Sequence, residues 1–125
     1  MTKSSGPSAQ DLLEAMRAGM GRVPAAIEKS TAIDEGLIHE HMRSRMYAMP
    51  AGGALDEETR TLIYLAAALA GSSPACVRAM ADKIAQQGIP AAKVLETVHI
   101  ARFAMATKMI GDAEPVFDAL IGSQK

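Results

Sequence analysis

The stretch LDEETRTLIYLAAALAGSSPACVRAMADKIAQQG, residues 55–88, contains the signals that begin and end two consecutive helices. Its first half opens with Asp56, a favoured N-cap, followed by two glutamates whose charges complement the positive end of a helix dipole. An apolar run follows and stops at Gly71, a residue type that ends helices. We therefore predict a helix over residues 57–70.

The second half of this stretch has its own start and stop signals. Ser73 is a favoured N-cap, Pro74 suits the first helical position, and Gly88 suits the position after the last turn. These residues predict a helix over residues 74–87. The chain's only cysteine, Cys76, then lies in the first turn of this helix.

Outside this stretch, the same boundary chemistry and helical spacing recur along the chain. Ser8 with Asp11 predicts the start of a short helix, Asp34 predicts another, and a long helix follows Pro90 and extends to about Ile110. No segment alternates apolar and polar residues as a half-buried strand would. We expect an all-α protein, a compact helical bundle of about six helices.

Length and composition indicate a single cytoplasmic domain. The 125 residues are enough to close one core, and we expect a disordered tail at residues 1–7 and one domain over residues 8–125. A net charge of -1, with only two Tyr and two Phe, argues against nucleic-acid binding. A single cysteine forms no internal disulfide, and no apolar run approaches the roughly 20 residues of a membrane span. We therefore expect a cytoplasmic protein with no nucleic-acid or membrane partner.

Two of the predicted helices lack a polar face. Residues 62–70 are apolar on every side, and the helix after Pro90 carries apolar residues on two sides. A helix that is apolar all round is buried, either within its own domain or against another subunit. We therefore expect the chain to form a homo-oligomer.

Cys76 is the first candidate catalytic residue. In the first turn of a helix, the dipole and the free backbone N–H groups stabilise a thiolate and lower the pKa of the cysteine. The alternative is structural, because cysteine is a small apolar residue that is often buried. Ser73 could act as a nucleophile only with a base in reach, so its position before Pro74 favours a capping role.

His99 is the second candidate catalytic residue, because it lies within the long helix that is predicted to be buried. Glu96 and Arg102 lie one turn away on the same helix, so His99 serves either as an acid or base or as a hydrogen-bonded core residue. His39 and His41 are two residues apart, whereas a helical metal pair needs a spacing of four. We predict no metal and no cofactor.

Residues 55–120 resemble the alkyl hydroperoxidase D and carboxymuconolactone decarboxylase family. The resemblance rests on LDEETR before an apolar helix, a GxxPxCxxxM segment where the family often has CxxC followed by His, a QQG turn, and a helix that begins PAAKVLETV. It implies an alkyl hydroperoxidase D-like helical subunit that assembles as a trimer or hexamer.

The resemblance also implies a redox site, most of whose residues are replaced in this sequence. Redox-active members have a Glu, two cysteines and a His at the positions that here hold Thr61, Ser73, Cys76 and Met80. With serine at position 73, Cys76 has no second thiol with which to close a disulfide. The proton relay that the Glu and the His provide is also missing.

Three functions remain open on these grounds. The first is a single-cysteine peroxidase or thiol oxidoreductase, an antioxidant role in which Cys76 becomes a sulfenic acid that an external thiol resolves. The alternative is a noncatalytic oligomeric assembly or small-ligand-binding module near Ser73, Cys76 and His99. The third is hydrolase or decarboxylase chemistry on a small acid, with His99, Arg102 and side chains of a neighbouring subunit.

Overall fold

The computed structural model describes residues 6–124 and contains seven α-helices and no strand within them. In chain order the helices are α1 (Ala9–Met20), α2 (Ala25–Ile33), α3 (Glu35–Ala48), α4 (Glu57–Ala70), α5 (Pro74–Gln87), α6 (Ala91–Asp112) and α7 (Glu114–Gly122). The predicted all-α class is confirmed, with seven helices where about six were expected. Residues 1–5 of the predicted tail lie outside the described residues.

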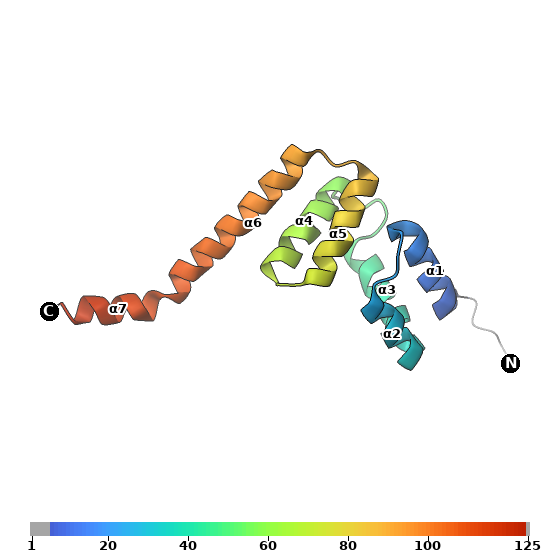
Figure 1. Ribbon diagram of the computed structural model, residues 1–125, viewed down its shortest axis with the longest axis horizontal. Coiled ribbons are helices and arrows are strands. Elements are labelled where there is room, and N and C mark those ends of the chain that lie inside the picture. The colour runs from blue at the N-terminus through green and yellow to red at the C-terminus, as the bar shows by residue number, and fades with distance from the viewer. Residues whose placement is uncertain (1–5, 125) are drawn as a thin grey trace.

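Helices α4 and α5 form a hairpin, and both have the bounds that their caps predicted (Figure 1). The Asp56 side chain accepts a hydrogen bond from the Thr59 backbone N–H at 2.7 Å. Gly88 ends α5 with φ 62° and ψ 37°, a left-handed conformation that favours glycine. The loop between the helices puts Ser72 at φ 54°, so the chain turns back on itself within three residues.

The predicted capping bond of Ser73 is wrong, although Ser73 does precede the first residue of α5. Its side chain accepts no hydrogen bond from the first turn. The cause is its backbone, which has φ -111° and ψ 88°, whereas the capping residues Ser8 and Asp56 have ψ near 165°. The Ser73 hydroxyl is therefore turned away from the amides that it was expected to cap.

Helices α1 to α3 pack into a small unit beside this hairpin. Its core consists of Ala9, Leu13 and Ile38, and the Ile38 side chain is 1% exposed. The predicted start of α1 is confirmed, because Ser8 and Asp11 accept hydrogen bonds from each other's backbone N–H at 3.0 Å.

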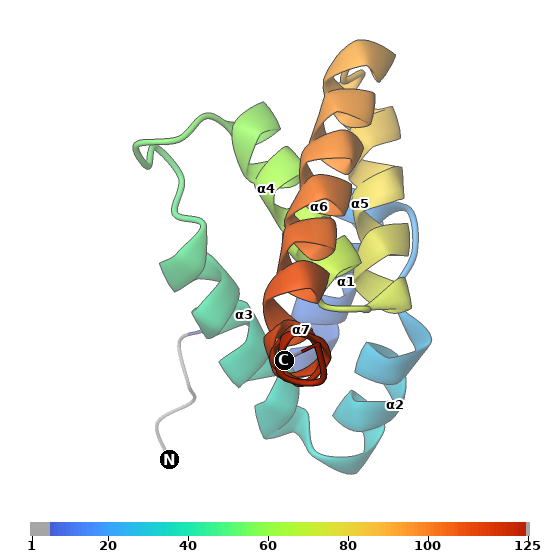
Figure 2. The ribbon, with the colours of Figure 1, turned by 90° about the vertical axis from the view of Figure 1, so that its left-hand side faces the viewer.

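The hairpin is attached on both sides. Arg22, in the α1–α2 connection, donates to the Asp82 carboxylate of α5 at 2.9 Å. On the other side, the first part of α6 packs along α4, where Lys93 pairs with Glu58 at 2.8 Å. Helix α4 lies between α5 and α6 in Figure 1, and Figure 2 shows α6 in front of both. Ile63 and Leu69 of α4 are nevertheless 52% and 37% exposed, so the predicted burial of residues 62–70 on every side is wrong for a single chain.

The rest of α6 and the whole of α7 extend away from the other helices (Figure 1). Within α6, which is described throughout, Ala101 is the one buried residue, so the predicted burial of this helix on two sides is wrong for a single chain. The helix also continues through Gly111 to Asp112, where the Lys108 and Asp112 side chains pair one turn apart. None of the helices in residues 6–124 is long and apolar enough to cross a membrane.

Candidate functional site

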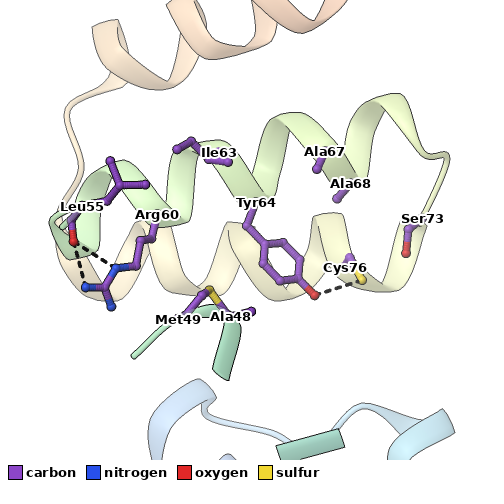
Figure 3. A pocket seen from close by; sticks show the side chains of 10 residues that line it. All are labelled: Ala48, Met49, Leu55, Arg60, Ile63, Tyr64, Ala67, Ala68, Ser73 and Cys76. Carbon is purple, nitrogen blue, oxygen red and sulfur yellow. Dashed lines mark hydrogen bonds between the residues drawn. The ribbon is translucent and has the colours of Figure 1, made fainter. Parts of the chain in front are cut away.

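An open cavity of about 480 Å³ lies against the α4–α5 hairpin and the end of α3 (Figure 3). Most of its surface is apolar. Four side chains contribute polar or charged atoms, namely those of Arg60, Tyr64, Ser73 and Cys76. The remaining lining residues are Ala48, Met49, Leu55, Ile63, Ala67 and Ala68.

The Cys76 thiol and the Tyr64 hydroxyl meet in this cavity. Tyr64 Oη lies 3.5 Å from Cys76 Sγ, and either atom can donate the hydrogen bond. Both side chains are partly buried, and in Figure 3 the Tyr64 ring reaches from α4 toward the first turn of α5. The pair therefore combines a nucleophilic atom with a hydroxyl on the surface of a space that a ligand can enter.

The surroundings of Cys76 favour its thiolate. The Ser73 hydroxyl, and after it the Tyr64 hydroxyl, lower the pKa of Cys76, and partial burial opposes them. The position of Cys76 in the first turn of α5 acts in the same direction, as the sequence predicted. The serine at position 73 thus lies beside the thiol instead of capping the helix.

Tyr64 has the opposite shift. Its hydrogen bond with Cys76, and then its own burial, raise its pKa above the usual value, while the charge of Arg45 acts against them. A tyrosine with a raised pKa remains protonated at neutral pH. Tyr64 therefore has a proton to donate, whereas it is unsuited to act as a base.

Thr61 and Met80, which stand where the family resemblance implies a Glu and a His, do not line the cavity. Thr61 is buried, and its Oγ1 lies 3.1 Å from both the Glu57 backbone oxygen and Gln87 Oε1. A hydroxyl has one hydrogen, so Thr61 donates to one of these acceptors at a time. Met80 is partly buried on α5. Neither residue replaces the acid or the His of a proton relay.

The structure does not bring His99 to Cys76 within one chain. His99 is exposed on α6 and does not line the cavity, and its neighbours Glu96 and Arg102 are exposed as well. Its expected burial is wrong for the single chain, and its catalytic role stays a prediction. Within residues 6–124, no group of three His, Cys, Asp or Glu side chains could hold a metal ion.

Sequence reasoning missed Tyr64, although one signal could have found it. Tyr64 is the one side chain with a hydroxyl in the apolar run of residues 62–70. A tyrosine on a packed helix usually finds a hydrogen-bond partner for its hydroxyl. The prediction treats residues 62–70 as apolar on every side and therefore assigns no hydrogen-bond partner to the Tyr64 hydroxyl.

The cavity residues also bear on the decarboxylase chemistry that the sequence left open. Among the described residues that line the cavity there is neither a histidine nor an acidic residue. The lining thus offers a thiol, two hydroxyls and one guanidinium.

Comparison with models of known protein families identifies one family that matches this chain. The model of the carboxymuconolactone decarboxylase family matches residues 39–118, which is more than half of the chain. This range includes the end of α3, the hairpin and all of α6, so every lining residue of the cavity falls within it. The search of curated proteins gives no match. The extent of the family match is decisive: the chain belongs to the carboxymuconolactone decarboxylase family.

Proposed function

We propose that the protein is a single-cysteine thiol peroxidase in which Cys76 reduces a hydroperoxide. The observation that carries this proposal is the pairing of the Cys76 thiol with the Tyr64 hydroxyl, 3.5 Å apart in an open and mostly apolar cavity. A peroxide reductase needs a thiolate and a proton for the product. The lowered pKa of Cys76 favours the first, and Tyr64 supplies the second.

In the first step, the Cys76 thiol loses its proton to water and the thiolate attacks the terminal oxygen of the hydroperoxide. The S–O bond forms as the O–O bond breaks, so the sulfur is oxidised to a sulfenic acid and the peroxide is reduced. The alkoxide that leaves takes the proton of Tyr64 and departs as an alcohol. Tyr64 then regains a proton from water.

An external thiol completes the cycle, because Ser73 stands where a second cysteine would close a disulfide. The thiolate of the external thiol attacks the sulfenic sulfur of Cys76. A mixed disulfide forms, and the hydroxyl group leaves as water. A second molecule of the external thiol then attacks the mixed disulfide and releases Cys76 as a thiolate. The products are an alcohol, water and the disulfide of the external thiol.

Trapping of the sulfenic acid tests this function. The native protein is treated with hydrogen peroxide in the presence of dimedone, and the label is located by peptide mass spectrometry. We expect labelling at Cys76 that is faster than in the unfolded protein, and none in Cys76→Ser. Labelling no faster in the native than in the unfolded protein would refute the proposal and favour the noncatalytic alternative.

We also propose that the chain assembles with copies of itself, as a trimer or hexamer in line with the family resemblance. The solvent-accessible surface of the single chain is 9245 Å², whereas a compact monomer of 13.1 kDa exposes about 6,400 Å². The surplus of roughly 2,800 Å² exceeds the about 800 Å² that one standard interface removes from each partner. The chain thus has enough surplus surface for more than one subunit contact.

The apolar side chains of the extended α6–α7 segment are the surface that such contacts would cover. They include Leu95, Ile100, Phe103, Met109, Ile110, Val116, Phe117, Leu120 and Ile121, each more than two-fifths exposed.

Light scattering after gel filtration tests the assembly. Wild type is expected to elute as an oligomer, and Phe103→Glu, which places a charge on a side chain that is 73% exposed, as a smaller species. Ser44→Glu, on the exposed surface of α3, is the control. A monomeric wild type would refute this assembly.

A further inference from the structure

The cavity beside Cys76 has a cationic end. Among the described residues that line it, Arg60 is the one charged side chain, and it lies on the same face of α4 as Tyr64 and Ala68. These three residues follow one another at intervals of four, so this face of α4 spans about 12 Å along the helix. Figure 3 shows Arg60 toward one end of the lining and Cys76 toward the other.

The guanidinium of Arg60 is held in place by the loop before α4. Its Nε and Nη2 donate to the Leu55 backbone oxygen at 3.0 and 2.8 Å. Gly53 leaves space for it, since a Cβ at that position would lie 3.1 Å from Arg60 Nη2. No hydrogen bond within residues 6–124 uses Nη1. Arg60 is therefore a fixed cation that retains donors for a ligand.

The charges around the cavity favour an anion. No acidic side chain is among the described lining residues. The hydrogen bond from the Thr59 backbone N–H is the main cause that lowers the pKa of Asp56, and the charge of Arg60 is the smallest of the causes. Arg45, at the end of α3, is near enough to Tyr64 to act on its pKa. A second positive charge, that of Arg45, therefore lies near the cavity and can help Arg60 to attract an anion.

We propose that this cavity binds a carboxylate with an apolar chain, with the carboxylate at Arg60 and the chain along α4 toward Cys76. The volume of about 480 Å³ is within the range of small-molecule sites, which are mostly apolar with a few polar groups that fix orientation. The chain contacts Ile63, Ala67 and Met49, and the charge-assisted hydrogen bonds of Arg60 set the direction in which the ligand lies.

This binding mode also predicts a substrate class for the proposed peroxidase. The predicted substrate class rests on the proposed function, whereas the binding does not. A ligand anchored at Arg60 presents the distal part of its chain to Cys76 and Tyr64. The substrate would then be a hydroperoxide of an aliphatic acid, with the peroxide group remote from the carboxylate. The binding itself does not depend on the thiol, so Cys76→Ala is expected to bind the same ligands.

Calorimetric titration of the full chain with decanoate and with decanol tests the binding. The two probes share a chain and differ in charge, and a charge-assisted hydrogen bond predicts that decanoate binds about tenfold more tightly. Arg60→Gln should abolish this preference, and Arg60→Lys should retain part of it. Arg43→Gln is the matched control, because Arg43 is an exposed arginine of α3 that does not line the cavity.

Arg60 also holds the loop at Leu55, so Arg60→Gln could affect folding as well as binding. A second variant that leaves Arg60 unchanged therefore tests the binding independently. Ala67 is exposed on the cavity face of α4, so Ala67→Phe fills the space without crowding the core, and should weaken both probes at least tenfold. Equal affinity of wild type for the two probes, or unchanged binding in Ala67→Phe, would overturn the proposal. Dimedone labelling with hydrogen peroxide, which needs no anchor, separates this failure from a failure of the peroxidase function.

Discussion

Substitution of Tyr64 by phenylalanine is the most direct test of the chemistry proposed for Cys76. The change removes one oxygen and leaves the ring that lines the cavity. It has two expected effects on the thiol. The thiolate loses a hydrogen-bond donor, so the pKa of Cys76 rises toward its ordinary value, and the departing alkoxide loses its proton donor.

The size of the second effect is limited by the geometry of the site. General acid catalysis contributes typically 10² to 10⁴ in rate. The cavity is open, so water can replace part of the lost donor, and we expect a decrease of about 10²-fold in the rate of sulfenic acid formation. The first effect is smaller, because a thiolate with a higher pKa is also a better nucleophile, with a Brønsted coefficient of about 0.4–0.5.

Two reagents separate these effects. Iodoacetamide reacts with the thiolate and releases iodide, a leaving group that needs no proton, whereas the alkoxide released from a hydroperoxide does. We expect Tyr64→Phe to slow the reaction with cumene hydroperoxide about 10²-fold, and alkylation at high pH by less than about tenfold. The control is Tyr47→Phe, because Tyr47 is 88% exposed on α3 and does not line the cavity.

The reasoning is refuted if Tyr64→Phe slows both reactions by the same factor. Tyr64 would then act only on the pKa of the thiol, and the proton for the product would come from water. Loss of folding is a minor concern. A partly exposed hydrogen bond contributes about 0.5–1.5 kcal/mol to the free energy of unfolding, and the Cys76 thiol left behind can still reach water.

Three further predictions concern stability and pH. Ile38→Ala should lower the free energy of unfolding by about 2–5 kcal/mol in urea titrations, and Ile33→Ala, at a side chain 87% exposed, by less than about 0.5 kcal/mol. Gly88→Ala should cost about 1–2 kcal/mol in the same assay through left-handed backbone strain alone, since nothing lies within 4 Å of the new Cβ. Because folding lowers the pKa of Cys76, its thiolate stabilises the fold above the unfolded pKa, and this contribution disappears as the pH falls through the folded pKa. Cys76→Ala should therefore destabilise the protein more at about pH 9 than at about pH 6, and an equal loss at both would contradict this sign.

The bounds of α4 and α5 could be predicted from the sequence because their end signals are local. Asp56 caps through an amide three residues away, and Gly88 ends α5 through its own backbone conformation. Whether the Ser73 side chain forms a capping bond could not be predicted in this way, because the bond depends on a ψ angle that the turn between the helices imposes. The residue type at position 73 indicated where α5 begins, but it did not determine the direction of the serine side chain.

The contacts of the site lay beyond local signals for a similar reason. The Tyr64–Cys76 pair depends on how α4 packs against α5. The position of the Arg60 guanidinium depends on the path of the loop before α4. The apolar pattern of α6 predicted burial of its side chains, whereas in the single chain Ala101 is the one buried residue of this helix. Such a pattern does not distinguish burial within one chain from burial between subunits, so the predicted burial of His99 does not hold for the single chain.

The proton chemistry of the site favours one half of a thiol peroxidase cycle over the other. Reduction of a peroxide consumes a thiolate and a proton donor, which Cys76 and Tyr64 can supply. Regeneration by an internal disulfide needs a second thiol and a base, and Ser73 and Thr61 stand at the positions where the family resemblance implies a cysteine and a glutamate. Tyr64 does not replace the base, because its raised pKa keeps it protonated. If the protein is a peroxidase, its turnover should therefore depend on the concentration of the external thiol, while the first oxidation of Cys76 should not.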